Sequence, residues 1–275
     1  NTFVGDKAGY RTSGNYNTAI GYRTMSGSSS GDTSHNNVAI GYVAMEDSTS
    51  ANENVIIGNF AGKEITTGDY NTAIGHAALR YGETTNRQVA VGYAALSQFT
   101  QSGDLRNTAV GMYAMLNPRS GSNNVAMGYG AMQGDNSVYD SDYNVALGSA
   151  TLFAIQGGNK NTAIGYQAGY NVTTGTGNVF IGYAAGANTS HDTESNTLVI
   201  ANSATTTPLI GGDFSAGTVT IDGTLNTTGL ITASGGVTMA ASQVFTMGGN
   251  GVDDILLAAD AVSTADDELV SAGYI

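Results

Sequence analysis

The chain has 275 residues, of which 39 are glycine and none is cysteine, so disulfides and thiolate metal sites are excluded. Only 11% of the residues are charged and 41% are hydrophobic, which excludes an ordinary disordered chain. The formal net charge of −13 opposes phosphate backbones and anionic membrane surfaces, so we expect neither nucleic acid binding nor membrane insertion.

One short pattern, Asn-(Thr/Val)-Ala-Ile-Gly-Tyr-x-Ala, recurs from the first residue to about residue 186. Six of the ten spacings between its glycines equal 17 residues, and the others are 16, 19 or 20. A repeat of this length predicts a solenoid in which each copy forms one coil. Because Gly reaches φ > 0 without a steric penalty, we interpret these residues as turn glycines. They are Gly5, Gly21, Gly41, Gly58, Gly75, Gly92, Gly111, Gly128, Gly148, Gly165 and Gly182.

Asn lies four residues before the turn glycine in ten of the eleven copies, and Gln88 is the exception. We expect its amide to hydrogen-bond the backbone at the turn or to stack in a ladder along the solenoid. The three residues between Asn and Gly are apolar or Thr, as in Val38, Ala39 and Ile40. This composition favours a parallel strand that pairs with the next coil, and eleven such coils would form a rod about 50 Å long.

Side chains alternate across a strand, so Val38 and Ile40 share one face and Ala39 points to the other. We expect the Val and Ile rows to fill the interior, together with the Ala and Leu or Met residues that follow each glycine. The middle Ala row would then form an apolar outer face. Such a face predicts close packing against copies of the same chain, so we expect a homo-oligomer.

The Asn-x-Ala-Ile-Gly-x-x-Ala coil resembles the head repeats of trimeric autotransporter adhesins, and the longer phrase from Thr173 to Gly186 is more similar to bacteriophage tail fibre proteins that contain the same roll. The resemblance implies an all-β, left-handed parallel β-roll (solenoid) that associates as a homotrimer. We expect about eleven 17-residue coils in residues 1–202.

The pattern weakens near Asn196, and the turn glycine is then lost. Residues 203–247 are expected to form a β-rich shaft, because Val219 and Ile221 alternate in a segment that ends at Asp222-Gly223, a turn signal.

Residues 248–275 are expected to connect to a helix or coiled coil. The stretch from Phe245 to Tyr274 is similar to connector segments of phage tail fibres. Thr264 and Asp267 have the spacing of a helix capping box.

Tyr follows the turn glycine in six copies. A ladder of exposed rings could stack on sugars of a receptor, and rings stacked to shield the edge of the coils would produce the same sequence. These candidate receptor contacts are Tyr22, Tyr42, Tyr93, Tyr129, Tyr166 and Tyr183.

Acidic residues gather in what we interpret as insertions between the strands, where a glycan hydrolase could keep a pair of carboxylates. Solvated loop residues explain them equally, so we expect no enzymatic activity, no catalytic residue and no cofactor. The acids are Glu46, Asp47, Asp135, Asp140 and Asp142.

His35, His76 and His191 lack the spacing of metal ligands. The segment from Gly248 to Leu256 fits the nonapeptide of calcium-binding β-rolls, in which successive turns share each ion. One copy cannot build such a site, so we interpret the segment as a turn and expect no metal site.

The resemblance to tail fibre proteins implies a structural fibre of a phage tail or virion appendage that spans distance and presents surface to a host cell. The head of an adhesin on a bacterial surface is the alternative, and a fibre-borne glycan hydrolase is a third. The expected partners are further copies of the chain, other virion or fibre proteins, and a host glycan or protein. Receptor contacts are expected in the polar insertions, such as residues 26–34, because loops tolerate changes of length.

Overall fold

The computed structural model describes residues 1–28, 31–117, 120–134, 140–188 and 191–228. One compact unit spans residues 1–225, and a second begins at residue 226. The nonapeptide, the capping box and the connector lie outside the described residues, as does the expected shaft beyond residue 228.

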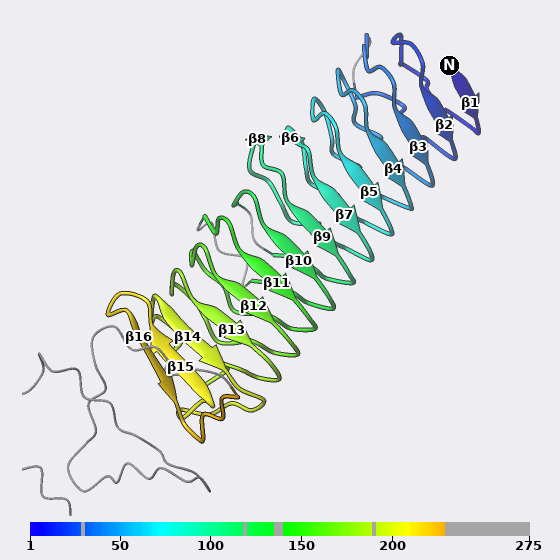
Figure 1. Cartoon of the computed structure of the whole chain (residues 1–275). Helices are drawn as coiled ribbons and strands as arrows, with labels where there is room; N and C mark the ends of the chain where they lie inside the picture. The colour runs from blue at the N-terminus through cyan, green and yellow to red at the C-terminus, as the bar shows by residue number, and fades with distance from the viewer. Residues whose placement is uncertain (29–30, 118–119, 135–139, 189–190, 229–275) are drawn as a thin grey trace, which may run out of the picture. The chain divides into compact units, whose positions relative to one another are not determined.

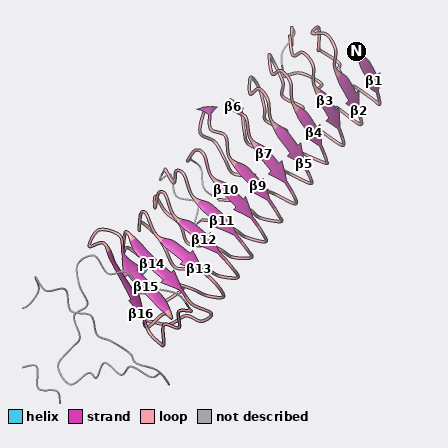
Figure 2. Cartoon of the chain, in the orientation of Figure 1, coloured by secondary structure: helices cyan, strands magenta, loops and turns pink. Residues whose placement is uncertain are grey.

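Short strands dominate the described part of the chain, which contains no helix (Figures 1 and 2). Fourteen strands form one sheet in chain order, and β6 and β8 form a separate pair. The strands are β1 (Thr2–Val4), β2 (Thr18–Ile20), β3 (Val38–Ile40), β4 (Val55–Ile57), β5 (Thr72–Ile74), β6 (Thr85–Asn86), β7 (Val89–Val91), β8 (Gly103–Asp104), β9 (Thr108–Val110), β10 (Val125–Met127), β11 (Val145–Leu147), β12 (Thr162–Ile164), β13 (Val179–Ile181), β14 (Thr197–Ile200), β15 (Ile210–Asp213) and β16 (Thr218–Ile221).

Each coil of residues 1–202 contributes one strand to the large sheet and then returns through turns to the start of the next strand (Figure 1). Neighbouring strands from β1 to β14 are parallel and pair residue for residue, so that Ala109 aligns with Ala126 and Ala126 with Ala146. The chain is therefore an all-β parallel solenoid of about eleven turns, as the 17-residue period predicted.

The middle Ala of the strand points into the coil. Ala39, Ala109 and Ala126 are fully buried, whereas Ile20 and Ile74, one row away, are 38% and 37% exposed. The expectation that the Val and Ile rows fill the interior and the Ala row faces outward is therefore wrong. Ala109→Glu or Ala126→Glu would place a charge in the core and not at a subunit contact.

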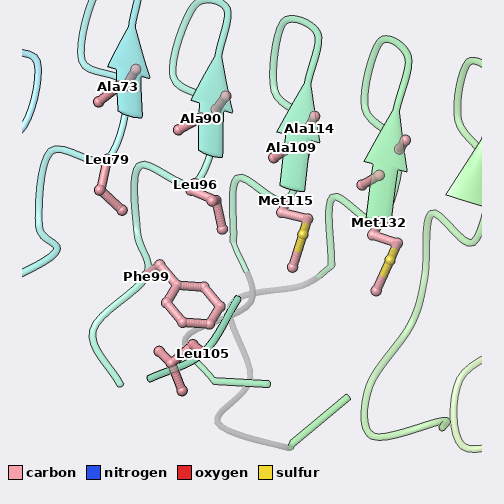
Figure 3. Close-up of a cluster of buried hydrophobic side chains, with 14 of the residues drawn as sticks. Ala73, Leu79, Ala90, Leu96, Phe99, Leu105, Ala109, Ala114, Met115 and Met132 are labelled. Carbon is pink, nitrogen blue, oxygen red and sulfur yellow. The ribbon is translucent and has the colours of Figure 1, made fainter. Parts of the chain in front are cut away.

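The interior is narrow, and this explains why Ala occupies the strand. The middle Ala row faces the Ala and Leu or Met residues that lie three and four positions after the turn glycine, and these are also buried. Figure 3 shows Leu79, Leu96, Met115 and Met132 in one row across successive coils. A small residue on the strand leaves room for these larger side chains.

Coils with a larger residue on the strand compensate by having Gly four positions after the turn glycine. Phe180 is paired with Gly186 and Ile56 with Gly62. A Cβ on Gly186 would lie 2.1 Å from the Phe180 ring, and a Cβ on Gly62 would lie 3.1 Å from Ile56 Cγ2. The coil at Gly5 follows the same rule with Phe3 and Gly9. In these three coils the large side chain on the strand fills the space that a side chain at the glycine would occupy.

All eleven turn glycines have φ between 118° and 139°. Their coils also stack so closely that a Cβ on Gly128 would lie 2.4 Å from the carbonyl oxygen of Gly148. Glycine is therefore required both for the backbone conformation and for the approach of the next coil.

The coil pattern ends at β14, which is parallel to β13 and aligns Thr197 with the ladder position of Asn178. Strands β15 and β16 then pair in antiparallel fashion. The turn that joins these two strands lies at residues 214–217. The sequence analysis expected a turn at Asp222-Gly223, which follows the end of β16. Val219 and Ile221 share a face of β16, as the alternation predicted.

Substitutions at two glycines distinguish the stability cost of a positive φ from the cost of crowding the next coil. Gly103 has φ of 109° but no atom within 4 Å of an added Cβ, whereas Gly128 has φ of 138° and a close backbone neighbour. We expect Gly103→Ala to cost about 1 to 3 kcal/mol from backbone strain alone. Gly128→Ala should cost clearly more, because the next coil must move. Equal free energies of unfolding in urea would show that stacking imposes no requirement for glycine.

Candidate functional site

A ladder of buried amides runs along the solenoid just before the strands. The Oδ1 of Asn124 accepts a hydrogen bond from the backbone N–H of Asn144 at 2.8 Å, and Asn144 Oδ1 accepts one from Asn161 N–H at 2.9 Å. Each internal member is at most 1% exposed. The ladder residues are Asn1, Asn17, Asn37, Asn54, Asn71, Gln88, Asn107, Asn124, Asn144, Asn161 and Asn178.

The Nδ2 of the same amide fixes the return of the next coil. Asn144 Nδ2 donates to the carbonyl of Gly158 at 2.9 Å, and Asn17 Nδ2 donates to that of Ser34 at 2.6 Å. In both cases the acceptor lies three residues before the next ladder Asn, although the coils are 17 and 20 residues long. Insertions are therefore confined to the residues before that acceptor.

Gln88 is the one irregular member. Its Oε1 accepts from Asn107 N–H at 3.2 Å, the longest such contact of the ladder, and its Nε2 turns back to the carbonyl of Asn86. The following coil has 19 residues and contains β8, which pairs with β6 just before Gln88. The longer Gln88 side chain still accepts the hydrogen bond from Asn107 N–H, but its amide nitrogen donates to the preceding Asn86 and not to a carbonyl of the next coil.

Four of the six tyrosines of the sequence pattern belong to a longer aromatic row. Ring centroids 5.2 to 6.0 Å apart connect seven successive coils without a break. A second segment joins Tyr166 and Tyr183 at 5.3 Å. The unbroken row consists of Tyr22, Tyr42, Phe60, His76, Tyr93, Tyr113 and Tyr129.

Sequence analysis missed three rings of this row. His76 is the residue directly after its turn glycine. Phe60 and Tyr113 lie two positions after their turn glycines, in coils where the first position after the glycine is not aromatic. The stacked pairs, such as Tyr22 with Tyr42 at an interplanar angle of 10°, cover each other's faces. Such stacking stabilises each pair by about 0.5 to 1.5 kcal/mol. The rings thus shield the coil edge while remaining partly exposed.

Two of the candidate hydrolase carboxylates, Glu46 and Asp47, are paired with cations. Glu46 lies 2.5 Å from Arg23, and Lys63 contacts both Glu46 and Asp47. Burial opposes the charge of Lys63, but the hydrogen bond and charge of Asp47 outweigh it and raise the pKa of Lys63.

Asp104 lies between two arginines at the surface. Hydrogen bonds from Arg87, which contributes most, and from Arg106 hold the pKa of this carboxyl below its usual value. Exposed pairs of this kind contribute little to stability.

Asp32 lies in the first insertion and is buried. It accepts hydrogen bonds from the hydroxyls of Thr12, Ser34 and Ser48 at 2.6 to 2.9 Å. The expectation that the whole segment of residues 26–34 projects as a loop is therefore wrong, because its ends belong to the coil.

In the third long coil, Asp142 accepts hydrogen bonds from the backbone and hydroxyl of Ser122. Asp140 is exposed, and Asp135 lies outside the described residues.

The histidines lie in three different settings. His35 Nδ1 accepts from the backbone of Asn15, His76 belongs to the aromatic row, and His191 contacts Glu194. Within the described ranges, no group of three His, Cys, Asp or Glu side chains is placed to hold a metal ion. No helix suited to crossing a membrane occurs in the part of the chain that the structure describes.

The fold and its repeated contacts define a parallel β-solenoid repeat protein. No protein-family model matches the chain, and comparisons with curated proteins and with solved structures find no match.

The ladder predicts a specific loss of stability. Asn144→Ala removes the acceptor of Asn161 N–H and the donor to the Gly158 carbonyl, and both groups are buried. Two unsatisfied groups should cost about 2 to 5 kcal/mol in urea unfolding. Asn15→Ala, at an exposed position, is the control and should change stability by less than about 0.5 kcal/mol. Similar losses for the two variants would contradict the structural role of the ladder.

Proposed function

We propose that this chain is a structural segment of a phage tail fibre or virion appendage, assembled as a homotrimer, that spans distance and presents surface for attachment to a host cell. The observation that carries the proposal is the outer face of the sheet. Two rows of side chains, Thr or Val after the ladder residue and Ile, Val, Leu or Met before the turn glycine, point away from the core along eleven parallel strands, and Leu198 and Ile200 of β14 continue them.

The composition of this outer face favours burial against another protein surface. Neither row contains a charged residue in any copy. Val4, Met127 and Ile164 are 55%, 45% and 39% exposed in the single chain. A long strip without charge, one of whose two rows is wholly apolar, is unusual on a monomer and typical of an interaction surface.

A second copy of the chain is the occupant that fits the strip best. Another solenoid has the same rise per coil, so its rows match coil for coil over the whole length. Twelve strands give a strip about 50 Å long and 10 Å wide, or about 500 Å². A stable interface buries about 800 Å² per partner, so side chains that flank the strip must contribute as well. The number of copies, three, follows from the resemblance to fibre and adhesin rolls.

Assembly is tested by solution mass. We expect the parent to measure about three times its chain mass of 27.9 kDa. Ile74→Asp combined with Ile164→Asp should yield monomers, because an unpaired carboxylate buried at a contact costs several kcal/mol. Asn15→Asp, on an exposed loop, should leave the assembly intact. A monomeric parent would contradict the proposal.

Attachment is proposed to involve the insertions and the aromatic row, with a host glycan or protein as the receptor. Deletion of residues 28–30 spares Asp32 and its hydrogen bonds, so we expect fold and assembly to be retained and adsorption of whole particles to the host to change. Unchanged adsorption after trimming all three insertions would assign this segment to spacing alone. Immunolabelling of purified virions distinguishes a virion fibre from an adhesin on a bacterial surface.

A further inference from the structure

The outer rows of the sheet continue beyond the last coil. Leu198 aligns with Val179 of the previous coil, and Ile200 aligns with Ile181. Across the change to antiparallel pairing, Ile200 aligns with Ile210 and Ile210 with Ile221.

In the second outer row, Leu198 aligns with Gly212 and Gly212 with Val219, so this row has no side chain on β15 and resumes at Val219 on β16. The hairpin β15–β16 therefore extends the outer strip by two strands.

The inner row ends where the outer rows continue. Val199 is 1% exposed and closes the core, but its partners along the sheet are Gly211 and then Thr220. All four residues of β16 are exposed, and Val219 is 65% exposed. The apolar residues of β16 thus contribute nothing to the core of the coils.

Further apolar side chains surround the outward residues of the hairpin. Leu209, Phe214 and Leu225 are each more than half exposed. Two cavities, each of about 570 Å³, border the hairpin, and their linings mix apolar residues such as Ile221 and Leu209 with threonines and Asp222. Exposed apolar side chains that lie outside the core and beside such hollows are typical of a protein contact.

We propose that the β15–β16 hairpin docks through Val219 and Ile221 on the same hairpin of neighbouring copies, so that the contact between copies runs unbroken from the coils into the segment that follows. The inference rests on the proposed self-association of the solenoid. A second copy is the occupant because the hairpin rows are collinear with the uncharged rows of the coils, and because two more strands lengthen a strip that is short of the area of a stable interface.

The test uses the full chain and residues on opposite faces of one strand. Val219→Asp combined with Ile221→Asp should raise the concentration at half-assembly at least tenfold. Thr220→Asp, on the other face of β16, should change it less than twofold. Val219→Thr with Ile221→Thr removes the apolar groups but keeps β-branched side chains, and it should weaken assembly in the same direction.

Crosslinking gives a second readout, because the chain has no cysteine. With a short bifunctional thiol reagent, Val219→Cys should form covalent multimers and Thr220→Cys should not. If the parent assembles but the paired variants match Thr220→Asp and Val219→Cys gives no multimers, the hairpin contact is overturned while self-association stands. A monomeric parent overturns both.

Discussion

The buried asparagine amide is the interaction on which the coil stack depends. Its Oδ1 accepts the backbone N–H of the next ladder residue, and its Nδ2 donates to a carbonyl three residues before that position, as Asn144 does toward Asn161 and Gly158. A buried amide with both ends bonded is stabilising, and one with either end free is costly. The ladder therefore fixes where each strand begins, whatever the length of the preceding coil.

Fixed register explains how insertions and a regular surface coexist. Additional residues can leave the coil only before the carbonyl that receives the Nδ2 bond, so the strands repeat along the stack without interruption by the insertions. One side of the coil varies in length, and the other presents the two uncharged outer rows. The coil stack therefore combines a uniform, uncharged face with a face of variable length.

The sequence predicted the period, the parallel strands and the turn glycines, because Asn and Gly mark the same point of every coil. It did not predict which strand face lies inside, since alternation shows only that Val38 and Ile40 share a face. The missed signal was the coincidence of Phe180 with Gly186 and of Ile56 with Gly62, which requires these residues to meet in the core. The sequence pattern also missed rings of the aromatic row, because the aromatic residue lies one position after the turn glycine in some coils and two positions after it in others.

The orientation of the strand is the central claim, and thiol labelling tests it directly in a chain that has no cysteine of its own. Ala109 is fully buried and Met112, just after the turn, is 43% exposed. We predict that Ala109→Cys reacts with a small maleimide only as fast as the protein unfolds, whereas Met112→Cys reacts at once. Rapid labelling of Ala109→Cys in the folded protein would contradict the account.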